Sequence, residues 1–189
     1  MKIGYCVEGS NDRALLTGLR DRWCPQAELM AGRFRGEFKR REIPDACFEL
    51  ATKGADLIIL LRDSNRENWR EVLRRDRERL QPPYANRVVV GVCERNVECW
   101  FAADADWIAR QFQRQAAEFR VDDPSHIFKS AAGITPLENR EGEVAKLVAD
   151  APLNNWLANS ISFENFYEQL RDQSLGLGCS FENLRERQR

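Results

Sequence analysis

The sequence lacks several features that would place it at once in a known class of protein. It has one histidine, and none of its six cysteines forms a CxxC pair, so a zinc site is not expected. It contains neither a GxGxxG nor a GxxxxGK(S/T) loop, which counts against a flavodoxin-like phosphate or nucleotide binder. No signal-peptide pattern opens the chain, and no apolar run approaches the ~20 residues of a membrane span. We therefore expect a cytoplasmic protein with free, structural thiols.

Charge is abundant but balanced. The chain has 29 basic and 30 acidic residues and a net charge of −1, so no global positive field argues for nucleic acid. Only five of the basic residues are lysines, and arginine suits bidentate contacts with phosphate and carboxylate. A compositional bias would explain the same excess of arginine. At 189 residues, the chain suits one domain.

Apolar runs alternate with helical patterns through the first two thirds of the chain. Strands are predicted at 3–7, 27–30, 57–61 and 88–92, and the last two are continuously apolar, which is typical of a parallel sheet covered on both faces. Helices are predicted at roughly 10–23, 44–53, 66–80, 97–111, 136–149 and from 162. We expect an α/β fold with a doubly wound, mainly parallel sheet flanked by helices. Residues 1–120 would form this core and 121–189 a helical extension packed on it, with 120–135 irregular and the tail beyond Gly176 loose.

Acidic residues follow three of the predicted strands. Glu8 comes after the first strand, Asp63 after the run at 57–61, and Glu94 and Glu98 after the run at 88–92. Ligands of open α/β sheets bind at the carboxyl ends of the strands, so these side chains are expected at one edge. Clustered carboxylates repel one another unless a cation or a proton offsets them. The pattern predicts a site for Mg²⁺ or Mn²⁺ and a phosphate-bearing substrate, although single acids of this kind are commonly just solvated.

These motifs resemble those of TOPRIM domains. The segment Val7-Glu8-Gly9-Ser10-Asn11-Asp12 is similar to the first TOPRIM motif, and Asp63-Ser64-Asn65 stands where the family has a DxD pair. Residues 96–104, NVECWFAAD, resemble the third acidic motif of the OLD-like branch, and more closely that of small stand-alone proteins encoded beside ABC-type ATPases. Residues 162–166 resemble the closing helix of that group. The likeness extends over residues 3–170 and implies a TOPRIM-like fold.

The resemblance also implies a function. It implies metal-dependent phosphodiester chemistry on nucleic acid, more specifically a DNA nuclease or nuclease-like subunit that works with an ABC-type ATPase in defence against foreign DNA. Glu8 would be a catalytic metal ligand or general base, and Asp63 and Glu98 would be catalytic metal ligands, with Asn65 assisting. Lys129 matches a lysine that OLD-like nucleases use after the third motif, and it could stabilise charge that develops at phosphorus.

One departure from the family pattern opens an alternative. Asn65 stands in place of the second acid of the DxD pair, and an amide oxygen can bind a hard cation but brings no charge. Two-metal catalysis is therefore in doubt. The chain could instead be a catalytically degenerate binding or adaptor subunit of an ATPase complex.

Arginines supply candidate contacts for a nucleic-acid backbone. Arginines recur every four residues from Arg62 to Arg74, which predicts a stripe of arginines on one helix face, beginning at the proposed metal site. A second basic patch lies in the glycine-punctuated loop at 32–42. Ordinary salt bridges on a surface helix, and a solvated loop, explain the same residues. The arginines selected as contacts are Arg35, Arg40, Arg62, Arg66 and Arg70.

Overall fold

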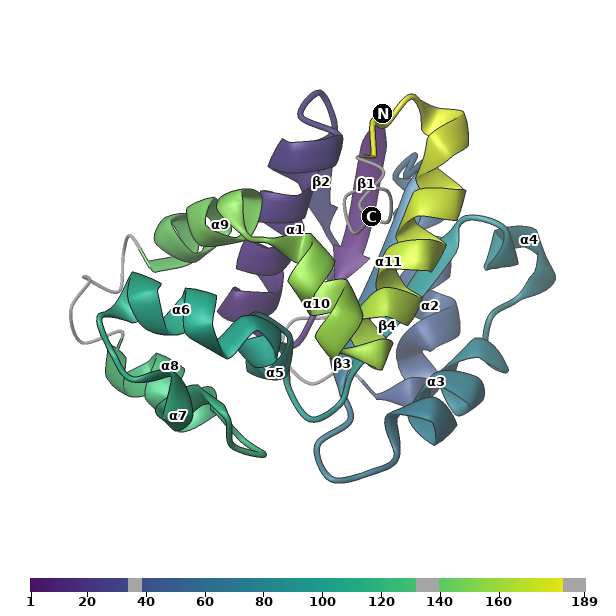
Figure 1. The fold of residues 1–189 in the computed structure, drawn as a ribbon. Helices are drawn as coiled ribbons and strands as arrows, with labels where there is room; N and C mark the ends of the chain where they lie inside the picture. Colours follow the sequence, from purple (N-terminus) through teal and green to yellow (C-terminus); the bar gives the residue numbers. More distant parts are fainter. Residues whose placement is uncertain (34–38, 132–139, 182–189) are drawn as a thin grey trace.

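The computed structural model describes residues 1–33, 39–131 and 140–181, except for the side chains of 129–131 and 140. It is an α/β structure in which helices flank a parallel sheet of four strands (Figure 1). The strands are β1 (Lys2–Cys6), β2 (Glu28–Ala31), β3 (Leu57–Asp63) and β4 (Val88–Cys93). The helices are α1 (Ser10–Trp23), α2 (Ile43–Thr52), α3 (Trp69–Arg77), α4 (Pro82–Ala85), α5 (Val97–Phe101), α6 (Ala105–Phe112), α7 (Ala116–Phe119), α8 (Ser125–Ala131), α9 (Arg140–Asp150), α10 (Leu153–Asn159) and α11 (Ile161–Ser174), with short 3-10 turns η1 (Arg40–Glu42), η2 (Ala102–Asp104) and η5 (Leu175–Leu177).

The sheet has the order β2-β1-β3-β4, and every neighbouring pair is parallel. The chain goes from β1 to β2 on one side and then returns to place β3 on the other side of β1. This reversal of direction between β1 and β3 is a topological switch point, where open α/β sheets form their ligand crevices. The prediction of an α/β fold with a parallel sheet flanked by helices is confirmed.

Alternating side chains of β3 feed two separate cores, as burial on both faces requires. Leu57, Ile59 and Leu61 pack into the larger core with α1, α5, α9 and α11, whereas Ile58 and Leu60 pack into the smaller core with α2 and α3. Rings of the C-terminal helices, among them Trp156, complete the larger core.

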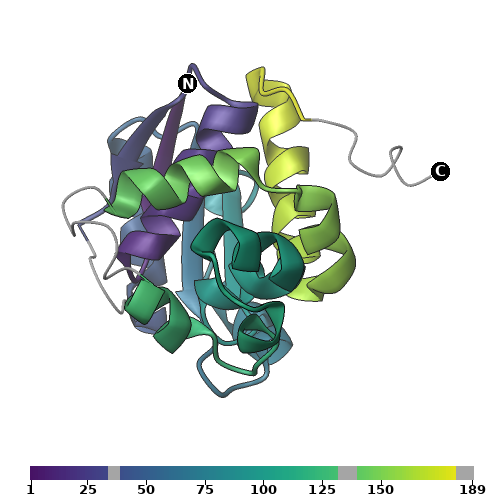
Figure 2. The ribbon, with the colours of Figure 1, turned by 60° about the vertical axis from the view of Figure 1, so that its left-hand side comes forward.

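Two glycines allow helices to approach closely. A Cβ on Gly18 of α1 would lie 2.4 Å from the carbonyl oxygen of Ala145 in α9, so only glycine fits where α9 lies across α1 (Figure 2). A Cβ on Gly91 of β4 would lie 2.7 Å from the ring of Phe166, where α11 packs on the strand.

Several predicted boundaries were wrong for local reasons. The helix predicted at 66–80 begins at Trp69, because Asn68 caps it by accepting the Arg70 N–H. The helix predicted at 97–111 is divided by η2, where Asp104 accepts the Trp107 N–H and starts α6. The segment 120–135, predicted to be irregular, contains α8. The last helix, predicted from 162, begins at Ile161, because Ser160 caps it by accepting the Phe163 N–H.

The segment from Gly176 to Phe181 is packed, contrary to the expectation of a loose tail. Cys179 forms a disulfide with Cys24, which lies 155 residues earlier, so the expectation of free thiols is wrong for these two cysteines. The Ser180 N–H donates to the carbonyl of Trp23, and the Phe181 ring packs on the Trp23 ring at 4.8 Å. Among the described residues, no helix combines the length and apolarity needed to span a membrane.

Candidate metal and phosphate site at the sheet edge

Three strand ends bring acidic side chains to the carboxyl edge of the sheet, the lower edge in Figure 1. Glu8 follows β1 by two residues, and Asp63 is the last residue of β3, so they come from the two strands that flank the switch point. Glu98 lies in the first turn of α5, which follows β4.

Asp12 joins these residues, and the sequence analysis did not assign it a role. It is buried in the first turn of α1, and its Oδ2 accepts the Gly9 N–H at 2.6 Å. An acid three residues after the N-cap can accept the N-cap N–H, which is one half of a helix capping box, and this spacing is the local signal that the sequence offers for Asp12. We call Glu8, Asp12, Asp63 and Glu98 the acid cluster.

The charges of the acid cluster act on one another. Burial, together with the charges of Asp12, Glu8 and Glu98, raises the pKa of Asp63 to about 8, against a smaller opposing effect of the Val97 N–H. Burial likewise raises the pKa of Asp12 to about 7, with contributions from Glu98 and Glu8, while the Gly9 N–H opposes the rise. A cation or a proton in this space therefore lowers the free energy of the folded protein.

Two oxygens of the acid cluster have no hydrogen-bond donor within the described part of the chain. They are Oδ1 of Asp12 and Oδ1 of Asp63, and both atoms are buried. A buried carboxylate oxygen without a donor is costly, because water no longer solvates it. Hard, partly desolvated oxygens of this kind are the donors that Mg²⁺ and Mn²⁺ prefer.

Protein donors engage the other two acids. Asn11 Nδ2 donates to Glu98 Oε1 at 2.8 Å, and Arg62 Nε lies 3.6 Å from Glu8 Oε1. Over residues 1–33, 39–131 and 140–181, no group of three or more histidine, cysteine, aspartate or glutamate side chains is arranged to hold a metal ion. The donor types suit a hard cation, but a coordination sphere requires the acid side chains to turn away from their present partners.

The other two predicted residues of the metal site differ in position. Asn65 is exposed on the turn after β3 and has a φ of 56°. Its N–H donates a hydrogen bond to the Arg95 carbonyl. Asparagine tolerates this left-handed conformation better than most residues, so the turn itself favours it. Lys129 belongs to α8, but its side chain lies outside the described residues, so its role stays a prediction.

The predicted arginine stripe is wrong. Arg62 lies on β3 and Arg66 on the turn that follows, so only Arg70 and Arg74 share helix α3. The Arg70 guanidinium stacks over the Trp69 ring at 4.6 Å, and Arg74 pairs with acids of its own helix. The stripe fails because β3 extends to Asp63, two residues beyond the predicted strand, and α3 starts at Trp69, three residues later than predicted. Arg35 lies outside the described residues.

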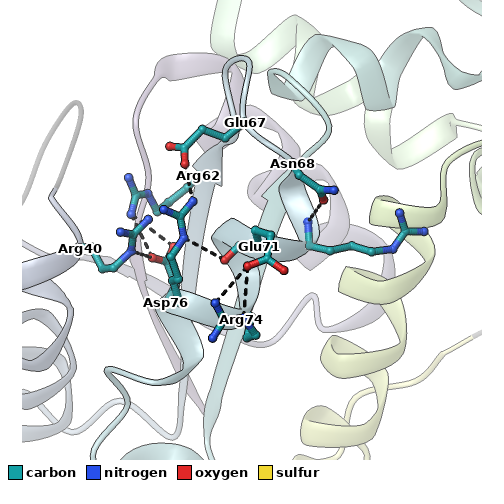
Figure 3. A network of polar contacts seen from close by, with 9 residues as sticks. Arg40, Arg62, Glu67, Asn68, Glu71, Arg74 and Asp76 are labelled. Carbon is teal, nitrogen blue, oxygen red and sulfur yellow. Dashed lines mark hydrogen bonds and ion pairs between the residues drawn. The ribbon is translucent and has the colours of Figure 1, made fainter.

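Arg40 and Arg62 meet instead at a buried acid (Figure 3). Asp76 of α3 is fully buried; its Oδ1 accepts from Arg40 Nε at 2.8 Å and its Oδ2 from Arg62 Nη1 at 3.2 Å. One buried carboxylate thus fixes two guanidinium groups that come from η1 and β3. Arg62 connects this pair to the acid cluster through its approach to Glu8.

Glu94, the other acid after β4, serves the fold. Its carboxylate accepts from the Ser160 hydroxyl at 3.1 Å and from the Ser162 N–H at 3.2 Å, as well as from the Ser162 hydroxyl. It thereby fixes the start of α11 against the end of β4. Glu94 is not part of the acid cluster.

Comparison with known proteins returns no match of any kind: neither a protein-family model, nor a curated protein, nor a solved structure shows significant similarity to the chain.

Proposed function

We propose that the protein carries out divalent-metal-dependent phosphodiester chemistry on nucleic acid, as a nuclease or nuclease-like subunit with a TOPRIM-like fold. Glu8, Asp12, Asp63 and Glu98 would hold Mg²⁺ or Mn²⁺, with Asn65 assisting. The observation that carries the proposal is the placement of two carboxylates, each with a buried oxygen that has no hydrogen-bond donor, beside two further acids at the switch point of a parallel sheet. A bound cation offsets the burial and the repulsion that raise the pKa of both aspartates.

The chain's own groups would divide the work. The acids supply negative oxygens for the ion, and when bound the ion polarises a phosphoryl oxygen and activates water. Arg62 lies 3.6 Å from Glu8, where its guanidinium can meet a phosphate oxygen as Glu8 turns toward the ion. Lys129 would stabilise the developing charge at phosphorus, as the resemblance to OLD-like nucleases implies.

The resemblance supports the finer parts of the proposal. From it we propose DNA as the substrate, an ABC-type ATPase as the partner, and defence against foreign DNA as the role. The proposals on substrate, partner and role rest on the motifs at Glu8, Asp63 and residues 96–104, and fold-level analogy alone would not support them. A cytoplasmic location stays a prediction, and the Cys24–Cys179 disulfide counts against it, because disulfides are rare in reducing compartments.

A specific observation favours the second candidate, a catalytically degenerate binding or adaptor subunit. Asn11 donates a hydrogen bond to Glu98 and Arg62 forms an ion pair with Glu8 without a metal ion, and Asn65 brings no charge. In the degenerate subunit, protein donors and protons on the aspartates would offset the negative charge of the acid cluster.

Cleavage and metal binding by matched variants separate the two candidates. Purified wild-type protein is incubated with linear DNA and Mg²⁺ or Mn²⁺, beside Glu8→Ala and Asp63→Asn. The control is Glu143→Ala, which removes an exposed acid of α9 that pairs with Lys146. We expect the two site variants to lose at least about 10- to 100-fold in rate, the loss that even outer partners of a metal cause, and the control to retain activity.

Titration of Mn²⁺ by calorimetry gives an independent measure. We expect one site in the wild type and in Glu143→Ala, and weakened binding in Asp63→Asn. Cleavage that survives Glu8→Ala unchanged comes from a contaminant and ends the catalytic proposal. Metal binding without cleavage would favour the degenerate subunit, and absence of both would refute the metal site.

A further inference from the structure

Three arginines gather around Glu67, and one of them, Arg62, approaches the acid cluster through Glu8. Figure 3 shows two of them, Arg40 and Arg62, beside Asp76 and Glu67. Arg40 comes from η1, Arg62 from β3 and Arg75 from α3, so the tertiary structure assembles them from three separate elements. We call these residues the arginine cluster.

Hydrogen bonds to other groups of the protein fix the arginine cluster in position. Buried Asp76 accepts from Arg40 and Arg62, and within the described residues Arg40 donates through its Nε only. The Arg75 Nε donates to the carbonyl of Glu71 at 3.1 Å. Guanidinium groups fixed by such contacts lose little further freedom when they bind an anion, which favours tight binding.

A carboxylate of the protein already lies on the arginine cluster. Glu67 pairs with Arg75, and the charges of Arg40 and Arg62 act on it as well. Its side chain is 59% exposed and belongs to the turn between β3 and α3, where its N–H donates to the carbonyl of Ser64 at 2.9 Å. Asp76, Glu8 and Glu67 together offset the three positive charges, so displacement of Glu67 would leave one positive charge in excess.

We propose that the arginine cluster is a binding subsite for a phosphate of the phosphodiester substrate, and that Glu67 occupies this subsite until the phosphate displaces it. Phosphate and carboxylate present similar oxygens to a guanidinium fork, so one can replace the other. The exposed turn can carry Glu67 away, whereas buried Asp76 stays and keeps Arg40 and Arg62 in position. Arg62 approaches Glu8, so the bound phosphate would lie next to the acid cluster. This inference rests on the proposed function, because it names the phosphate contact of that same site.

Binding without metal tests the subsite separately from catalysis. The probe is a fluorescent single-stranded DNA oligonucleotide, followed by anisotropy at low salt with a chelator present. Glu67→Gln removes the competing charge, and Glu78→Gln is the matched control, since Glu78 is equally exposed and pairs with Arg74 of the same helix. We expect Glu67→Gln to bind about two- to five-fold more tightly, the range that exposed ion pairs correspond to, and Glu78→Gln to match the wild type. Arg75→Gln is expected to bind more weakly than the wild type.

Competition with pyrophosphate identifies the recognised group. Pyrophosphate should displace the oligonucleotide from the wild type at a lower concentration than from Arg75→Gln. Equal binding by Glu67→Gln and Glu78→Gln, or unchanged binding by Arg75→Gln, overturns the subsite. Pyrophosphate binding that depends on Glu67 without any oligonucleotide binding overturns the phosphodiester assignment. All these binding measurements are made without metal. Their result therefore does not depend on whether the wild type cleaves DNA or whether Glu8→Ala abolishes cleavage.

Discussion

Asp63 is expected to make the metal-free protein less stable as the pH rises. Burial raises its pKa from 3.8 to about 8, so above pH 4 the unfolded chain loses a proton that the folded protein keeps. Stability therefore falls with pH across this window and levels off above pH 8. Each pH unit costs about 1.4 kcal/mol, so the free energy of unfolding should fall by about 4 kcal/mol between pH 5 and pH 8.

Urea unfolding of Asp63→Asn in the presence of a chelator measures this effect. Asparagine cannot ionise, so we expect the stability of the variant relative to that of the wild type to increase by about 4 kcal/mol between pH 5 and pH 8. Some slope remains in the variant, because the pKa of Asp12 is also raised, to about 7.

Asp123→Asn is the control with the opposite sign. Contacts with Ser125 hold the pKa of Asp123 at about 2, so its contribution is present above pH 4 and is lost as the pH falls toward 2. This variant should gain nothing at pH 8. The reasoning about the acid cluster is refuted if wild-type stability is flat from pH 5 to pH 8, or if the stability of Asp63→Asn relative to that of the wild type does not increase over this range.

Three further predictions concern the fold. Reduction of the Cys24–Cys179 disulfide, which closes a loop across 155 residues, should lower the free energy of unfolding by about 3–5 kcal/mol in urea titrations with and without dithiothreitol. Gly18→Ala should cost about 1–3 kcal/mol because its Cβ would clash with α9, whereas Gly142→Ala, whose Cβ would meet nothing within 4 Å, should be neutral or stabilising; equal effects would refute the close approach. Glu94→Gln should destabilise by about 1–3 kcal/mol and speed amide exchange at the start of α11, and unchanged exchange would contradict its capping role.

Much of the acid cluster could be predicted because strand ends are easy to locate in this sequence. The runs at 57–61 and 88–92 are continuously apolar and both became strands, so Asp63 and Glu98 could be assigned to one sheet edge. Asp12 was missed because it lies within a helix, and its side chain reaches the cluster only through the turn at Gly9.

The arginines were harder to predict, because their partners are distant in sequence. The four-residue spacing suggested a stripe, but β3 continues to Asp63 and includes Arg62, and the helix capped by Asn68 starts three residues later than predicted. The meeting of Arg40 and Arg62 at Asp76 has no local signal, since η1, β3 and α3 come together only when the sheet forms.

The sequence by itself determined the parallel α/β sheet and the placement of acids at its carboxyl edge, because both follow from short-range patterns of burial and chain direction. The tertiary structure alone decided which oxygens stay without a donor, which arginines meet, and that Cys179 reaches Cys24. These features depend on distances between groups far apart in the chain, and the packing of helices on the sheet sets those distances.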